Sequence, residues 1–156
     1  MAANDPSQQD ANANFVAQTQ EPYKAGHHLS DGTVYGSRNK KGQDLFVAPQ
    51  DLPGGPKTLR EAQEAIAELN RNNYLGHNDW DLPTGWDDPD HNDELAVLCE
   101  HRKAIGGFKK NGLEACYGSS SLFCDGVCAR YFDDGVQDLR YEVKPWSWRF
   151  LRRVNP

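Results

Sequence analysis

The segment GHNDWDLPT, at residues 76–84, decides how the middle of the chain is built. Trp80 and Leu82 lie two positions apart, so both side chains point to one face, as they do in a short strand. Pro83 stops that strand because it has no N–H to donate to a sheet, and Thr84 is a residue type that caps helices. The segment therefore predicts a short strand with one buried face, followed by a helix cap.

A helix is predicted on the N-terminal side of this segment. Thr58 and Glu61 are spaced as a capping box, in which each side chain satisfies a backbone N–H of the other residue. Apolar residues then follow at helical spacing, namely Leu59, Ala62, Ile66 and Leu69. The pattern predicts a helix from Thr58 to about Arg71.

A second helix is expected on the C-terminal side. It starts near Asn92 or Asp93, because the acidic pair Asp93-Glu94 suits the positive end of a helix dipole. Leu95 and Leu98 form its inner face, and the glycine pair at 106–107 ends it.

Short strands are expected near both ends of the chain. β-rich runs lie at residues 33–35, 45–47 and 127–132, with alternating residues at Leu139, Tyr141 and Val143 and again at Trp146, Trp148 and Phe150. The serines Ser119, Ser120 and Ser121 are expected to supply turn hydrogen bonds beside a buried Tyr117. Two early strands, two helices and closing strands predict an α+β domain.

The first part of the chain differs in composition. Residues 1–20 are rich in Ala, Asn, Gln and Asp, with Phe15 and Val16 as the only aromatic and branched aliphatic side chains. Such a segment buries too little surface to offset its ordering entropy. We expect residues 1–26 to form a disordered tail and residues 27–156 to form one domain, with ordered structure from about Leu29.

Composition excludes several classes of protein. Of 156 residues, 37% are hydrophobic, and 17 Lys and Arg against 23 Asp and Glu give a net charge of −6. No apolar run reaches the ~18 residues that a membrane span needs. An acidic chain also lacks the basic face that general nucleic-acid binding requires.

Six segments together resemble a known family. They are GHNDWDLPT at 76–84, DELAVL at 93–98, Gly107-Phe108, YGSSS at 117–121, FDDG at 132–135 and WRFLRRV at 148–154. In this order they resemble the bacterial domain family named for the C-terminal domain of the Legionella collagen-like adhesin. The resemblance covers about residues 29–154 and implies a compact C-type lectin-like fold, related to formylglycine-generating enzymes. It also implies an adhesin-like module, since the domain that names the family recognises sulfated polysaccharides, and it makes His77 a structural hydrogen-bonding residue.

The chain departs from the family pattern at three places. Asp81 replaces an arginine and Gly118 replaces a tryptophan. About eight residues, 85–92, are inserted where the family pattern places the threonine cap almost directly before the helix. Long insertions cost little entropy and often carry function, so this inserted loop is a candidate site.

The inserted loop is strongly acidic. Eight acids and no Lys or Arg lie between Asp79 and Glu100. An EF-hand is excluded, because Asp93 stands where that loop needs glycine and Cys99 where it needs glutamate. A looser Ca²⁺ site would use Asp87, Asp88, Asp90 and Asp93. A transition metal at His91 is a second alternative, and we favour a solvated loop with Trp86 tucked onto the domain.

The C-terminal region carries the opposite charge. Arginines, among them Arg149, lie near Trp146 and Trp148, a composition suited to binding sulfate, carboxylate or sugar. The same pattern is typical of a last strand with outward arginines, which we favour, and the arginines would then pair with the acidic loop.

Four cysteines leave three interpretations open. Cys124 and Cys128 are spaced to close a small loop, after which Cys99 would meet Cys116. A four-cysteine zinc site and free cytosolic thiols are the alternatives. Disulfides would indicate an oxidising compartment, which we slightly favour, so we expect a secreted or extracytoplasmic protein over a cytoplasmic one.

The function we expect is non-catalytic ligand recognition. No nucleophile elbow, dinucleotide motif or cysteine–histidine dyad is present in the sequence. A polysaccharide or protein ligand would contact the loops at 86–92 and 119–126, with Trp86, Ser119–Ser121, Trp146 and Arg149 as binding residues and Ca²⁺ as a candidate cofactor. The alternatives are an effector or interaction protein targeted by its tail, and a thiol or metal enzyme.

Overall fold

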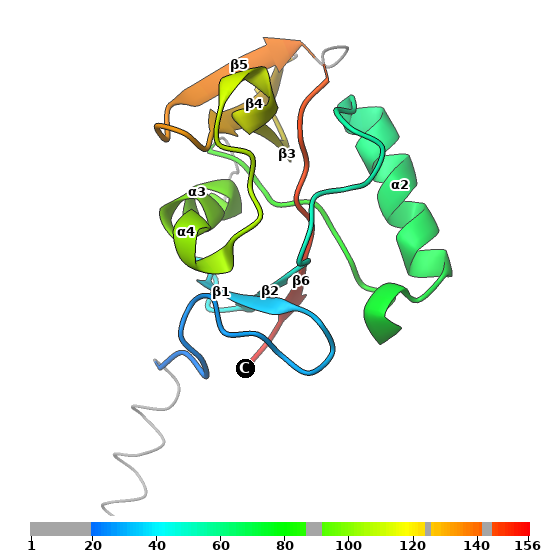
Figure 1. Cartoon of the computed structure of the whole chain (residues 1–156), viewed down its shortest axis with the longest axis vertical. Coiled ribbons are helices and arrows are strands. Elements are labelled where there is room, and N and C mark those ends of the chain that lie inside the picture. The colour runs from blue at the N-terminus through cyan, green and yellow to red at the C-terminus, as the bar shows by residue number, and fades with distance from the viewer. Residues whose placement is uncertain (1–19, 87–91, 124–125, 142–144) are drawn as a thin grey trace, which may run out of the picture.

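The computed structural model describes residues 20–86, 92–123, 126–141 and 145–156 (Figure 1). Its helices are α2 (Leu59–Arg71), α3 (Glu94–Glu100) and α4 (Arg102–Ile105), with the 3-10 turns η1 (Tyr74–Gly76) and η2 (Gly112–Ala115). Its strands are β1 (Val34–Arg38), β2 (Asp44–Val47), β3 (Cys116–Phe123), β4 (Gly126–Tyr131), β5 (Gln137–Tyr141) and β6 (Leu151–Val154). The predicted α+β class is confirmed.

The strands form two small antiparallel sheets. The first has the order β1-β2-β6, so the last strand pairs with one of the first, with Asp44 opposite Val154 and Val47 opposite Leu151. The second sheet is the meander β3-β4-β5. In Figure 1, α3 and α4 lie between the two sheets, and α2 lies on the other side of the segment that leads into β6.

Two hydrophobic clusters hold these layers together. One packs the inner face of α2 against the tryptophans Trp80, Trp146 and Trp148 and against Phe150. The other packs α3 against the first sheet and includes Tyr117 and Phe132. Trp80 and Leu82 are both buried while Asp81 bridges to Leu151, so the alternation predicted for residues 80–82 is confirmed.

The predicted first helix is confirmed in its cap as well as its length. Thr58 Oγ1 accepts from the backbone N–H of Glu61, and the Glu61 carboxylate accepts from the backbone N–H of Thr58 at 2.9 Å. Leu59, Ala62 and Ile66 form its buried face.

The second helix is split into two, where the sequence predicted one. α3 ends at Glu100, His101 adopts a non-helical conformation, and α4 continues to Ile105. Arg102 donates from Nη1 to the Cys99 carbonyl at 2.7 Å, which satisfies a carbonyl at the end of α3. The predicted glycine end is correct, since Gly106 follows α4 with φ of 84°.

Two expectations about the second half of the chain are corrected. Ser119–Ser121 belong to strand β3, where a turn was expected, because β3 pairs with β4 on either side of an irregularity between Gly118 and Leu122. The segment 146–150 was expected to alternate with an outward Arg149. It runs through the interior instead, so Ser147 and Arg149 are buried together with the aromatic residues.

The packed part of the chain starts earlier than Leu29. Tyr23 stacks on His27 with ring centroids 4.8 Å apart and contacts Tyr35 and Phe46. Ser37 Oγ donates to the Glu21 carboxylate at 2.7 Å. Residues 20–26, assigned above to the tail, therefore contact the domain, and residues 1–19 lie outside the described part of the chain.

Candidate functional site

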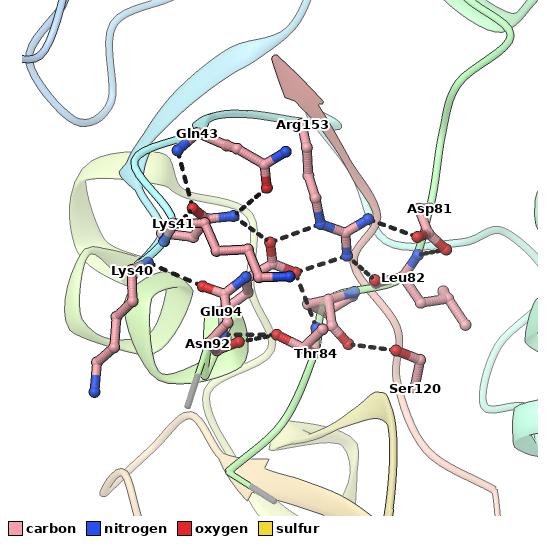
Figure 2. A network of polar contacts seen from close by, with 12 residues as sticks. Lys40, Lys41, Gln43, Asp81, Leu82, Thr84, Asn92, Glu94, Ser120 and Arg153 are labelled. Atoms are coloured by element: carbon pink, nitrogen blue, oxygen red, sulfur yellow. Dashed lines mark hydrogen bonds and ion pairs between the residues drawn. The ribbon is translucent and has the colours of Figure 1, made fainter. Parts of the chain in front are cut away.

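A buried carboxylate stands at the base of the inserted loop (Figure 2). Asp93 caps α3 by accepting from the backbone N–H of Ala96 at 3.0 Å, and this places Glu94 in the first turn, facing the first sheet. Arg153 of β6 donates from Nε and Nη2 to the two Glu94 oxygens, each at 2.7 Å. The result is a two-point ion pair between the start of α3 and the last strand.

Two further groups donate hydrogen bonds to the Glu94 carboxylate. Asn39 Nδ2 donates to Glu94 Oε2 at 2.9 Å, and the backbone N–H of Thr84 donates to Oε1 at 3.0 Å. Arg153 also reaches Asp81 Oδ2 from Nη1 at 2.6 Å. Burial lowers the pKa of Arg153, but hydrogen bonds and the charges of Glu94 and Asp81 outweigh burial and raise that pKa overall. Arg153 is therefore a permanent cation that holds Glu94 and Asp81 together.

The two ends of the inserted loop are joined directly above this ion pair. Thr84 Oγ1 donates to the carbonyl of Asn92, and the backbone N–H of Leu95 donates to the Thr84 carbonyl at 2.9 Å. The side-chain oxygen of Asn92 accepts from the backbone N–H of Lys40 at 2.9 Å. The base of the loop is thus fixed, while residues 87–91, which include Asp87, Asp88, Asp90 and His91, lie outside the described residues.

The start of the loop meets the β3–β4 hairpin. The backbone N–H of Gly85 donates to Ser121 Oγ at 2.7 Å, and that of Ser120 donates to the Pro83 carbonyl at 2.9 Å. A Cβ atom at Gly85 would lie 2.3 Å from Ser119 Oγ, so only glycine permits this approach. The described parts of the two segments predicted to form one site, Trp86 with its neighbour Gly85 and residues 119–123, are therefore adjacent.

Aromatic surface gathers at this junction. The rings of Trp86 and Phe123 lie 5.6 Å apart with a tilt of 52°. Phe123 is 41% exposed and its neighbour Leu122 is 50% exposed. We call Trp86, Leu122 and Phe123 the loop aromatic surface. Trp86 was predicted, whereas Phe123 was missed, although its place in the sequence, shortly after the serine run, was a usable signal.

Three predicted binding residues lie in the interior instead. Ser119 Oγ donates to the Cys128 carbonyl at 2.6 Å, and Trp146 is 1% exposed. Arg149 is also buried and donates from Nε to Asp51 Oδ1 at 2.9 Å. Their contacts build the fold, and a ligand at the surface does not reach them.

Four acids in the described part of the acidic segment pair with arginines. Asp79 pairs with Arg152, Asp81 and Glu94 with Arg153, and Asp93 with Arg130 at 3.1 Å. This agrees with the interpretation that C-terminal arginines pair with these acids. Asp93, a proposed Ca²⁺ ligand, is already used by the helix cap and by Arg130. No group of three or more metal-ligating side chains occurs among the described residues.

The cysteines in the described ranges are buried and form no disulfide with one another. These are Cys99, Cys116 and Cys128, whereas Cys124 lies outside those ranges. The pairing of Cys99 with Cys116 is therefore absent here. Burial raises the pKa of the Cys99 thiol, although the charges of Arg102 and Arg130 oppose this effect. The raised pKa keeps the thiol protonated and poorly nucleophilic.

His77 has the structural role that the resemblance implies. Its Nε2 lies 2.8 Å from Asp31 Oδ2, which ties the segment 76–84 to the turn before β1. Gly118, where the pattern of the resembled family has tryptophan, is explained by packing. A Cβ atom there would lie 2.6 Å from the ring of Trp148, which occupies that space.

No protein-family model matches the chain, and a search of curated proteins finds no match either. Among the described residues, no helix is long and apolar enough to span a bilayer.

Proposed function

We propose that this domain is a non-catalytic recognition module of the lectin-like type implied by the sequence resemblance. It binds a polysaccharide through the loop aromatic surface. The observation that carries this proposal is the contact between Trp86, at the start of the inserted loop, and Phe123, at the end of β3, with much of Phe123 and Leu122 left exposed.

The positions of these residues support binding more than folding. The loop base is fixed by Thr84, Asn92 and Glu94, so the aromatic rings stand on a rigid support. Aromatic rings offer a flat apolar face at low entropic cost, and they suit the apolar face of a sugar ring. A rigid aromatic pair of this kind is typical of binding surfaces.

A protein ligand is the alternative, and Ca²⁺ is retained as a candidate cofactor. The cation would be held by Asp87, Asp88 and Asp90, next to Trp86 in the sequence. It would rigidify the inserted loop, and calcium would then raise the affinity for the ligand.

The test is a binding titration of the whole chain with dextran, alginate and dextran sulfate, each in millimolar calcium and in EDTA. We expect saturable binding of at least one of them, and Phe123→Ala should weaken it about tenfold, as loss of one central aromatic does elsewhere. Leu113→Ala is the matched control, because Leu113 is 72% exposed and lies in η2, away from the loops.

Absence of saturable binding to all three polysaccharides would contradict the carbohydrate proposal. Equal affinities for the wild type and Phe123→Ala would remove the loop aromatic surface from it. A higher affinity in calcium than in EDTA would support a cation bound at the inserted loop.

A further inference from the structure

A cavity lies at the end of α4, on a part of the domain away from the loop aromatic surface. Its volume is about 410 Å³, within the usual range for small-molecule sites. It is lined by Arg102 and Lys103 of α4, by residues 106–110, and by Phe132 and Asp133 after β4. None of these residues belongs to the loop aromatic surface, so the inference below does not rest on the proposed function.

The charge of this cavity is opposite to that of the chain. Four cationic side chains line it, Arg102, Lys103, Lys109 and Lys110, against the single carboxylate of Asp133, in a chain of net charge −6. We call it the lysine cavity. Its three lysines are exposed, and none of them has an ion-pair partner among the described residues, unlike the arginines of the Glu94 region.

A further cation stands behind the wall of the cavity. The Arg149 guanidinium lies 4.0 Å from the centre of the Phe108 ring and donates from Nη1 to the Gly106 carbonyl at 3.1 Å. Its Nη2 is buried and has no hydrogen-bond partner in the described structure. A Cβ atom at Gly107 would lie 3.1 Å from that nitrogen, so Nη2 sits directly beneath the lining residue Gly107. The Asp51 carboxylate offsets part of this charge on the opposite side.

The floor of the cavity is aromatic. Phe108 and Phe132 are buried with ring centroids 4.7 Å apart, and both line the cavity. Phe108 is 7% exposed and Phe132 is 2% exposed, so a ligand here meets the amino groups of the lysines and a small apolar area. The site therefore suits an anion that carries an apolar group.

We propose that the lysine cavity binds a small phosphate monoester, with the phosphate among Lys103, Lys109 and Lys110 and an aromatic or apolar group against Phe108 and Phe132. Lysine ammonium groups act as compact point charges, and several of them favour a phosphate monoester, which carries a charge of about −2, over a singly charged carboxylate. The volume of about 410 Å³ suits a small molecule.

The probe for the test is phenyl phosphate, titrated into the whole chain by calorimetry at low ionic strength. We expect a dissociation constant of about 1 mM or tighter. Inorganic phosphate should bind about tenfold more weakly, because it lacks the ring, and phenol should not bind.

Two double variants distinguish binding at the cavity from a general effect of the net charge. Lys103→Gln with Lys109→Gln should weaken phenyl phosphate about tenfold or more, since two direct charges are lost. Lys24→Gln with Lys40→Gln removes the same net charge at exposed positions elsewhere and should leave the affinity within about twofold.

Several results would overturn the proposal. They are no saturable binding of phenyl phosphate, equal losses in both double variants, or equal affinity for phenyl sulfate, which would remove the preference for phosphate. Dextran sulfate binding that depends on Lys103 and Lys109, with no binding of phenyl phosphate, would replace the small ligand with a polyanion.

Discussion

The Glu94 region and the lysine cavity handle charge in opposite ways. In the first, Glu94 is buried and accepts four hydrogen bonds, two of them from Arg153. In the second, Lys103, Lys109 and Lys110 are exposed and line a cavity with one carboxylate, that of Asp133. The paired charges of the Glu94 region build the fold, whereas the unpaired lysines of the cavity are those that we propose to contact a ligand.

Energetics explain why the two regions differ. A buried carboxylate without a partner costs several kcal/mol, so Glu94 is tolerable only with its donors in place. Exposed lysines are hydrated and cost the fold little. A substitution in the Glu94 region, the matched region, should therefore change the free energy of unfolding. A substitution in the lysine cavity, the unmatched region, should change ligand binding instead.

The largest expected effect breaks the matched region. Glu94→Ala leaves the Arg153 guanidinium without its main partner and should lower the free energy of unfolding by about 3–5 kcal/mol. Urea denaturation measures this change. Glu64→Ala is the control, because its ion pair with Arg60 is exposed and should contribute no more than about 0.5 kcal/mol. A loss below about 1 kcal/mol at Glu94 would show that the buried pair does not hold the fold.

An intermediate effect is expected at Asp31, a matched charge nearer the surface. Burial raises the pKa of Asp31, but hydrogen bonds from Thr33 and His77 outweigh it and lower the pKa from 3.8 to about 2. Because the folded pKa is the lower one, the carboxylate stabilises the fold above about pH 4, and this contribution is lost as the pH falls towards about 2.

The measurement is urea denaturation of the wild type and Asp31→Asn at about pH 5 and about pH 2. The stability difference between them should shrink by about 1 kcal/mol at the lower pH, allowing for solvent screening of this partly exposed group. A difference that stays constant with pH would mean that the Asp31 charge contributes nothing.

The smallest effect is expected in the unmatched region. The double variant Lys103→Gln and Lys109→Gln should change the free energy of unfolding by less than about 0.5 kcal/mol, because neither lysine has an ion pair with a described residue. Thermal denaturation without ligand checks this. A clear loss of stability would place these lysines with the fold-building charges and end the contrast between the two regions.

Local signals made part of the fold predictable. The capping box of α2 and its apolar spacing lie within a few residues of one another, so the sequence alone specifies that helix. The same holds for Trp80 and Leu82, whose burial follows from simple alternation. In the candidate site, Trp86 and the serine run were identified, and the structure places them side by side.

Partners distant in the sequence were not predictable. Glu94 was read as a helix-dipole acid, because its partner Arg153 is 59 positions away and leaves no local trace. Arg149 was expected outside because it alternates with tryptophans, yet Asp51, 98 positions away, makes its burial tolerable. The lysine cavity was missed although its cations all lie within residues 102–110, because Phe132 and Asp133 join that stretch only in three dimensions.

The pairing of β6 with β2 ties folding to the order of synthesis. The β1–β2 hairpin and α2 use neighbouring residues and can form while the ribosome is still working. The strand pairing of Asp44 with Val154 and the ion pair of Glu94 with Arg153 can form only after residues 153 and 154 have been synthesised. At typical translation rates, the 59 residues from Glu94 to Arg153 take roughly 3–12 s to make. Until then Glu94 lacks its partner Arg153. The four-residue strand β6 therefore supplies a contact that the rest of the domain needs in order to fold.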